Sequence, residues 1–277
     1  MTQRASTTDF GTTRDGLRQL RRHWAADDPR AALLLVHGIG EHSGRYEHVG
    51  EAFAESGIDT LAADGRGFGR TAGRPGHVDS FDEYVDDVAD LLSERRTLGV
   101  PVILMGHSLG GLIVTTYLVG DHPQPDLAVL SAPALAAEIP RWQRLAVPVL
   151  SRIAPRLHVK SEFDGSVLSR DPAVQDAYDN DPLRVDGSTT ALGRHVIDAM
   201  KSTSSRLHRL RVPTYVLHGA DDELVPPSAS EPIGRLTDVT RRVWPGLRHE
   251  CLNEPERDEV IAAIIEWVDA HLAELHG

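Results

Sequence analysis

The sequence predicts an α/β protein whose mainly parallel sheet is flanked by helices. Short apolar runs rich in β-branched residues recur along the chain, and most of them are followed by glycine or proline. Helix-like stretches separate these runs, and strands that alternate with helices form mainly parallel sheets. The runs expected to form strands are residues 31–36, 58–63, 102–105, 127–130, 212–217 and 240–244.

Length and composition favour one large domain over residues 1–277. Of the 277 residues, 40% are hydrophobic, and no shift in composition divides the chain. Its 41 acidic and 29 basic side chains give a net charge of −12, which argues against nucleic acid as a partner. A single cysteine excludes an internal disulfide, and the polar N-terminus lacks a secretory signal. No apolar run reaches the ~20 residues that span a bilayer, so we expect a cytoplasmic protein.

Two helices have clear boundaries in the sequence. Ser80 and Glu83 are expected to form a capping box for a helix that runs to Gly99 with an apolar stripe at a 3.6-residue period. The acidic face of this helix, within residues 82–90, is interpreted as a solvated outer surface rather than a metal site. Pro255 is expected to open a last helix whose apolar stripe closes one side of the sheet.

The alternation of strands and helices breaks between Ser131 and Leu210. This stretch contains an apolar series at helical spacing over residues 139–153, turn-forming Asp-Pro pairs and a second helical run, but no strong strand. Because it leaves the sheet after one strand and returns at the next, we expect an insertion, residues 134–206, that covers the carboxyl edge of the sheet. Pro148 is expected to kink or end the first helix and to give the insertion a hinge.

A strand-turn-helix motif supplies a candidate nucleophile. Residues 106–110 read Gly-His-Ser-Leu-Gly, directly after an expected buried strand and before an apolar helical run. This is the GxSxG pattern, in which a sharp turn pushes the serine outward. Gly106 and Gly110 are needed because a Cβ at either position would collide with backbone. Ser108 is therefore the candidate nucleophile.

A second glycine-rich turn follows the strand expected at residues 31–36. This turn, His-Gly-Ile-Gly at 37–40, stands where backbone amides can converge with the amide that follows the nucleophile. We expect the amides of Ile39 and Leu109 to form an oxyanion hole. Loss of one such donor costs about 3–4 kcal/mol of transition-state stabilisation.

Several segments together resemble the monoacylglycerol lipases, a family of α/β-hydrolases. The resemblance begins in residues 37–46, continues in 64–69 and in the helix at Ser80, and returns at the GxSxG turn and in 165–170 and 178–183. Only the first ~30 residues show no particular likeness. The resemblance implies the α/β-hydrolase fold, with a mainly parallel eight-stranded sheet and with the insertion as a helical cap.

In the α/β-hydrolase arrangement, the catalytic acid follows the serine and the histidine follows the acid. Three histidines come late enough, and His249 lies in a loop directly after an expected strand, whereas those at 271 and 276 lie on or beyond the last helix. Three carboxylates, at 221, 222 and 223, follow the strand expected at 212–217. The hydrolase pattern that this segment resembles selects Asp222 as the acid, with Asp221 as the alternative.

The resemblance also implies the chemistry. Ser108 would attack the ester of a monoacylglycerol while His249, oriented by Asp222, moves the proton, and water would then hydrolyse the acyl-enzyme. No metal or organic cofactor is needed. Four residues match family positions near the polar site for the glycerol group: Glu41, Arg45, His107 and Tyr178.

The sequence also leaves alternative functions open and indicates the class of partner. A carboxylesterase or lysophospholipase would share this chemistry with a differently shaped cap, and a non-catalytic binding protein would share only the fold. The expected partner is a small lipid ester, and no obligate protein partner is implied. Arginines at 141, 144 and 152 beside the apolar series suggest transient contact of the cap with a membrane or micelle surface, so peripheral association is also expected.

Overall fold

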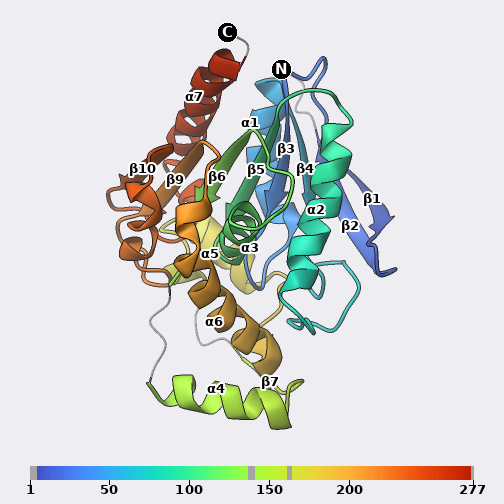
Figure 1. Cartoon of the computed structure of the whole chain (residues 1–277), viewed down its shortest axis with the longest axis vertical. Coiled ribbons are helices and arrows are strands. Elements are labelled where there is room, and N and C mark those ends of the chain that lie inside the picture. The colour runs from blue at the N-terminus through green and yellow to red at the C-terminus, as the bar shows by residue number, and fades with distance from the viewer. Residues whose placement is uncertain (1–4, 137–140, 161–163, 276–277) are drawn as a thin grey trace.

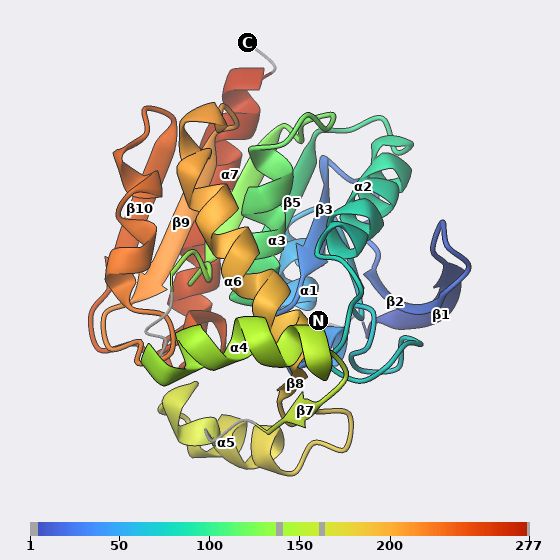
Figure 2. The same ribbon diagram turned by 60° about the horizontal axis from the view of Figure 1, so that its bottom comes forward.

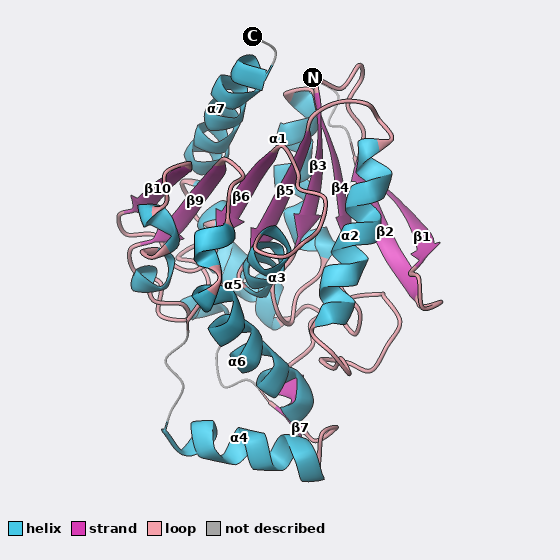
Figure 3. Cartoon of the chain, in the orientation of Figure 1, coloured by secondary structure: helices cyan, strands magenta, loops and turns pink. Residues whose placement is uncertain are grey.

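An eight-stranded sheet forms the centre of the protein (Figure 3). The structure is a computed structural model that describes residues 5–136, 141–160 and 164–275. The strand order is β1-β2-β4-β3-β5-β6-β9-β10, parallel from β4 to β10, with β1 and β2 antiparallel at one edge. The expected mainly parallel eight-stranded sheet is therefore confirmed. The strands are β1 Thr7–Thr12, β2 Arg18–Trp24, β3 Ala31–Val36, β4 Ile58–Ala63, β5 Val102–His107, β6 Leu127–Ser131, β9 Thr214–Gly219 and β10 Val239–Trp244.

Helices cover both faces of this sheet and create two apolar cores. Successive residues of β3 point to opposite sides, so Leu33 and Leu35 enter one core and Leu34 the other. Because both faces are buried, the central strands are continuous apolar runs. The first core is closed by α1 (Glu47–Glu55) and α7 (Arg257–Leu275), and the second by α2 (Asp82–Arg96), α3 (Leu109–Leu118) and α6 (Thr190–Ser205).

The antiparallel edge is the part of the sheet that the apolar runs did not predict. All six expected strands are present, but β1 and β2 lie in the N-terminal segment that shows no apolar run. Strand β1 is almost wholly exposed, and β2 carries three arginines. The buried side chains of Gln19, Leu20 and Trp24 tie β2 to the core, and the Trp24 indole donates to Glu47 at 2.8 Å.

The start of α2 differs from the expected capping box. The helix begins at Asp82 and ends at Arg96, three residues before Gly99. The Ser80 hydroxyl accepts from the Asp82 amide at 3.2 Å, while the Glu83 carboxylate turns away toward Arg66 at 3.3 Å. A nearby guanidinium thus attracts the side chain that would have completed the box.

The acidic face of α2 is not simply solvated, which corrects the expectation from the sequence. Arg14 contacts Asp86 at 2.9 Å and also pairs with Asp90. Asp87 is buried and holds the Arg66 guanidinium through two hydrogen bonds of 2.7 and 2.8 Å. The carboxylates of this helix therefore bind the N-terminal segment and the loop after β4 to the domain.

The segment between β6 and β9 lies beyond the carboxyl ends of the parallel strands (Figures 1 and 2). Besides α6 it holds α4 (Arg141–Ile153), β7 (His158–Val159), α5 (Pro172–Asp179) and β8 (Ser188–Thr189). Strands β7 and β8 pair only with each other, which agrees with the expected lack of a strong strand. Helix α4 continues through Pro148, so the proline does not end it. Residues 139 and 140 and the side chains at 141–146, including both arginines there, lie outside the description.

Across residues 5–136, 141–160 and 164–275, no helix combines the length and the apolar character that crossing a bilayer requires.

Candidate active site

The turn from β5 into α3 holds Ser108 in a strained backbone conformation. Its φ of 52° and ψ of −116° lie outside the regions that side-chain-bearing residues favour. A Cβ at Gly106 would stand 2.4 Å from the Gly110 carbonyl oxygen, and one at Gly110 would stand 2.1 Å from the carbonyl oxygen of Val36. The steric need for both glycines is thus confirmed, and the turn presents Ser108 at the carboxyl end of β5.

Asp222 and His249 meet although they come from the ends of different strands. Asp222 follows β9, His249 follows β10, and the His249 Nδ1 stands 2.7 Å from Asp222 Oδ2. Both side chains are buried, whereas Asp221 and Glu223 are exposed. Of the three neighbouring carboxylates, only that of Asp222 is directed inward to the histidine.

Backbone amides fix the Asp222 carboxylate from the other side. The amides of Leu224 and Val225 each donate to Oδ1 at 2.9 Å. Burial alone would raise the pKa of Asp222, but hydrogen bonds from His218 and His249 outweigh it and hold this pKa well below the usual range. An ionised carboxylate accepts a hydrogen bond from His249 Nδ1–H, and in that tautomer Nε2 carries the lone pair that a base requires.

Ser108 and His249 line one cavity of about 200 Å³. Ile39 and Leu109, whose amides are the expected oxyanion donors, line it as well. The four matched polar positions are also on its wall: Glu41, Arg45, His107 and Tyr178. The structure therefore brings every site residue predicted from the sequence into or directly behind one cavity, with Asp222 standing behind His249.

One end of the cavity is a buried ion cluster. Arg45 donates to Glu41 at 3.2 Å and makes two hydrogen bonds to Glu250, one of them 2.8 Å. The Arg45 guanidinium also lies 5.0 Å from the centre of the Tyr178 ring. Burial would raise the pKa of Glu250, but the charge of Arg45 outweighs it and brings this pKa to about 2. Two carboxylates thus surround one guanidinium at this end.

His107 is held beside the candidate base without sharing its role. Its Nδ1 stands 3.1 Å from the Ser131 hydroxyl, and its ring centre lies 4.8 Å from that of His249. Burial and the nearby His249 lower the pKa of His107 to about 4. The ring is therefore neutral near pH 7 and forms a wall of the cavity.

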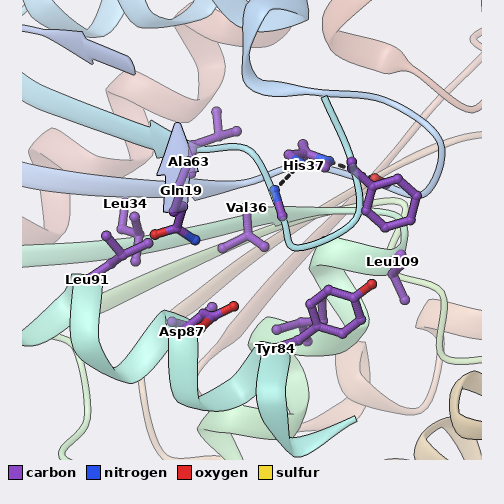
Figure 4. Close-up of a pocket in the computed structure, with 15 residues that line it drawn as sticks. Gln19, Leu34, Val36, His37, Ala63, Tyr84, Asp87, Leu91 and Leu109 are labelled. Atoms are coloured by element: carbon purple, nitrogen blue, oxygen red, sulfur yellow. Dashed lines mark hydrogen bonds between the residues drawn. The ribbon is translucent and has the colours of Figure 1, made fainter. Parts of the chain in front are cut away.

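A separate cavity of about 40 Å³ is lined by residues of β3 and α2 together with His37 and Gly38 of the turn after β3 (Figure 4). Its lining is mostly apolar and shares Gly38 and Leu109 with the larger cavity. At its rim, His37 Nδ1 donates to the Gly38 carbonyl and Nε2 accepts from the Gly65 amide, both at 2.7 Å. This imidazole fastens the turn to the loop after β4.

Two residues at the site were missed from the sequence. Glu250 completes the ion cluster, and His218 contacts Asp222 at 3.2 Å. Glu250 directly follows His249 and His218 stands four residues before Asp222, but neither position by itself signals the contact that the residue makes. Over the part of the chain that the structure describes, no group of three or more His, Cys, Asp or Glu side chains is arranged to hold a metal ion.

Comparison with known proteins agrees with the observed fold. Residues 27–256 match the family described as serine aminopeptidase, S33. A monoacylglycerol lipase of Mycolicibacterium smegmatis is 36% identical over 93% of this chain and 95% of its own length. The phospholipase YtpA of Bacillus subtilis is 33% identical over 90% of this chain and 99% of its own. The crystal structure of Paleococcus ferrophilus monoacylglycerol lipase superposes with a TM-score of 0.84 at 32% identity, covering 92% of this chain and 99% of that one.

Proposed function

The chain belongs to the α/β-hydrolase family described as serine aminopeptidase, S33, and is an ester hydrolase; from this premise we propose that it cleaves monoacylglycerols into a fatty acid and glycerol. The observation that carries the proposal is the pairing of Asp222 with His249 at 2.7 Å on the wall that also holds Ser108. That arrangement suits a Ser-His-Asp triad.

The proposed reaction has two steps. His249 takes the proton of Ser108 as its oxygen attacks the ester carbonyl, the amides of Ile39 and Leu109 stabilise the oxyanion, and His249 then protonates the departing glycerol. A water molecule, deprotonated by the same imidazole, attacks the acyl-enzyme carbonyl. The bond to Ser108 then breaks, His249 returns the proton to the serine oxygen, and the fatty acid leaves. Asp222 remains ionised throughout and stabilises the imidazolium that forms in each step.

The cavity is amphipathic, as a monoacylglycerol is. Its polar end is the ion cluster around Arg45, and its apolar wall is formed by Leu168, Val196, Met200 and their neighbours. Met200 also lines a groove of about 730 Å³ between α4 and α6. We place the glycerol hydroxyls against the ion cluster and the acyl chain along Met200 into that groove, so that residues 134–206 act as a cap.

The charge of the polar end favours glycerol over a phosphate headgroup. Glu41 and Glu250 oppose the single guanidinium of Arg45, so an anionic group would meet two carboxylates at short range. Hydroxyl groups can donate to those carboxylates without this repulsion. A lysophospholipid is therefore expected to be a poorer substrate than a monoacylglycerol of the same chain length.

The test combines one variant with a substrate panel. Ser108→Ala is expected to lower kcat on a monoacylglycerol by roughly 10⁴-fold or more with the fold intact by circular dichroism. Ser151→Ala, a hydroxyl change on α4 away from the cavity, serves as the matched control and is expected to keep the wild-type rate. Retained activity in Ser108→Ala would show that another nucleophile acts. Faster hydrolysis of lysophospholipids, triacylglycerols or acetyl esters would refute the proposed substrate.

We further propose that the cap touches lipid surfaces through its outer face. Four apolar side chains are about half or more exposed there: Val149 (56%), Ile153 (73%), Leu157 (48%) and Val159 (53%). Arg152 and Arg156 lie among them in the sequence, which suits an interface. Flotation with phosphatidylcholine vesicles is expected to carry a fraction of the protein, and complete absence from the lipid layer would refute the contact.

A further inference from the structure

His218 supplies a second imidazole to the candidate catalytic acid. It is the fifth residue of β9, and its side chain is fully buried. Its Nε2 stands 2.8 Å from the Val225 carbonyl oxygen and 3.2 Å from Asp222 Oδ2. A carbonyl oxygen can only accept a hydrogen bond, so Nε2 must carry a proton. That N–H donates to the Val225 carbonyl oxygen, and Asp222 Oδ2 is its second neighbour at 3.2 Å.

Whether the other ring nitrogen of His218, Nδ1, carries a proton depends on Ser230. The Ser230 hydroxyl stands 3.0 Å from His218 Nδ1 and also 3.0 Å from the Pro227 carbonyl oxygen, and it has one proton to give. Arg241 Nε donates to the Ser230 oxygen at 2.9 Å, and another Arg241 nitrogen donates to the Pro227 carbonyl at 2.7 Å. The Pro227 carbonyl is therefore satisfied without the hydroxyl.

Only one proton arrangement satisfies these groups without a new buried charge. If Ser230 donated to Pro227, then Nδ1 of His218 would need a proton of its own, and an imidazolium would form beside the Arg241 guanidinium in a buried site. If Ser230 donates to Nδ1 instead, every donor and acceptor is paired and the His218 ring is neutral. The neutral ring with its proton on Nε2 is thus the state that the surroundings select.

This state surrounds the Asp222 carboxylate with four N–H groups. The two backbone amides donate to Oδ1, while Oδ2 pairs with His249 Nδ1 at 2.7 Å and faces the N–H of His218 at 3.2 Å. A carboxylate held at both oxygens cannot rotate, so the imidazole of His249 keeps the orientation that proton transfer requires.

We propose that His218 is a positioning residue for the hydrolytic reaction, acting as a neutral second imidazole that holds Asp222 in line for His249. The inference rests on the proposed function, in which His249 is the base. It assigns His218 no contact with substrate, because the residue acts through Asp222.

Kinetics of two variants test the proposal. His218→Met fills similar volume without a donor and is expected to lower kcat roughly tenfold while KM stays within about twofold, since misalignment acts on the reacting geometry. His218→Gln places an amide N–H toward the same oxygens and is expected to keep more than about half of the wild-type kcat. Equal losses in both variants, or wild-type kcat in both, would overturn the proposal.

A spectroscopic readout separates this role from a merely structural one. With His218→Met, Asp222 Oδ2 loses a competing donor, so the proton resonance of His249 Nδ1 is expected to move to lower field, whereas His218→Gln should leave it near the wild-type position. A lower melting temperature with an unmoved resonance would mean that His218 only packs, which contradicts the proposal. If the methionine variant does not fold, His218→Asn replaces it, because its shorter amide stops short of Asp222.

The two proposals fail in distinguishable ways. The resonance is measured without substrate, so it tests the link from His218 to His249 even if the enzyme proves inactive on monoacylglycerols. Failure of the wild-type enzyme to hydrolyse monoacylglycerols would refute the proposed function alone.

Discussion

Two parts of the cap are attached to the molecule in different ways. Residues 165–170 are joined by hydrogen bonds directly to the loop that carries His249. The Glu250 amide donates to the Leu168 carbonyl at 2.8 Å, and the Arg170 amide donates to the buried Glu254 carboxylate at 3.0 Å. Glu254 also accepts from the Arg248 amide at 2.7 Å, so one carboxylate joins the two segments.

Helix α4, by contrast, packs on α6, and the residues that follow α4 hydrogen-bond to the start of α6. The Thr190 amide donates to the Leu157 carbonyl at 2.9 Å and the Ala191 amide to that of Pro155 at 3.0 Å. On its outer face Val149 and Ile153 are exposed. In Figure 1, α4 lies at the end of the molecule farthest from most of the sheet.

Because they are attached differently, the two parts of the cap are expected to have different roles. The segment 165–170 belongs to the frame that positions His249, so changes there are expected to affect both stability and catalysis. Helix α4 contributes to the groove proposed for the acyl chain and to the outer surface, so changes there are expected to affect access to lipid with little cost in stability.

The largest expected effect is a change of stability with pH, and it comes from Glu250 in the loop that is hydrogen-bonded to residues 165–170. The pKa of Glu250 is lowered to about 2 in the folded protein, so its pairing with Arg45 stabilises the fold fully above about pH 5 and is lost as pH falls toward 2. The contribution is at most about 3 kcal/mol. We expect the stability difference between wild type and Glu250→Gln, measured by urea unfolding, to shrink over this range. Glu55→Gln, an exposed carboxylate on α1, is the control, and a constant difference down to pH 2.5 would contradict the assignment.

A second, smaller effect is expected at the junction itself. Glu254→Ala leaves the amides of Arg170 and Arg248 without their acceptor, which should cost about 2 kcal/mol of unfolding free energy. Because the loop then loosens around His249, kcat should fall as well. Denaturant unfolding and initial rates measure both, and a variant that loses stability but keeps kcat would separate the anchor from catalysis.

The smallest expected change in stability lies on α4. Ile153→Ser replaces a side chain that is 73% exposed, so unfolding free energy should stay within about 0.5 kcal/mol of wild type. Hydrolysis of a dissolved short-chain ester should be unchanged, while hydrolysis of monoacylglycerol in vesicles should slow. Equal slowing on both substrates would show that α4 serves the active site rather than the lipid surface.

The sequence predicted those parts of the fold that local patterns determine. The bounds of β3 and β4 match the apolar runs residue for residue, because both strands are buried on both faces. Strand β2 was missed, since its neighbours β1 and β4 rather than its own composition hold it in the sheet. The charged face of α2 was misjudged for the same reason: the arginine that pairs with Asp87 lies 21 residues away.

Local sequence patterns also predicted the candidate active site only in part. Ser108, Asp222 and His249 could be chosen because each follows an expected strand and strand ends meet at one edge. The Arg45–Glu250 pair joins residues 205 positions apart, and no local pattern reports such a contact. The same holds for His218, whose role depends on where Ser230 and Arg241 lie in the folded chain.

The two edge strands of the sheet affect how readily the protein aggregates at high concentration. An unpaired strand invites a strand from a neighbouring molecule, and such pairing seeds aggregates. Here β1 is polar and almost wholly exposed, and β10 carries Arg241 and Arg242 in the middle of its length. Desolvating these charged and polar side chains opposes the addition of a ninth strand at either border, so the chain is protected against intermolecular sheet growth.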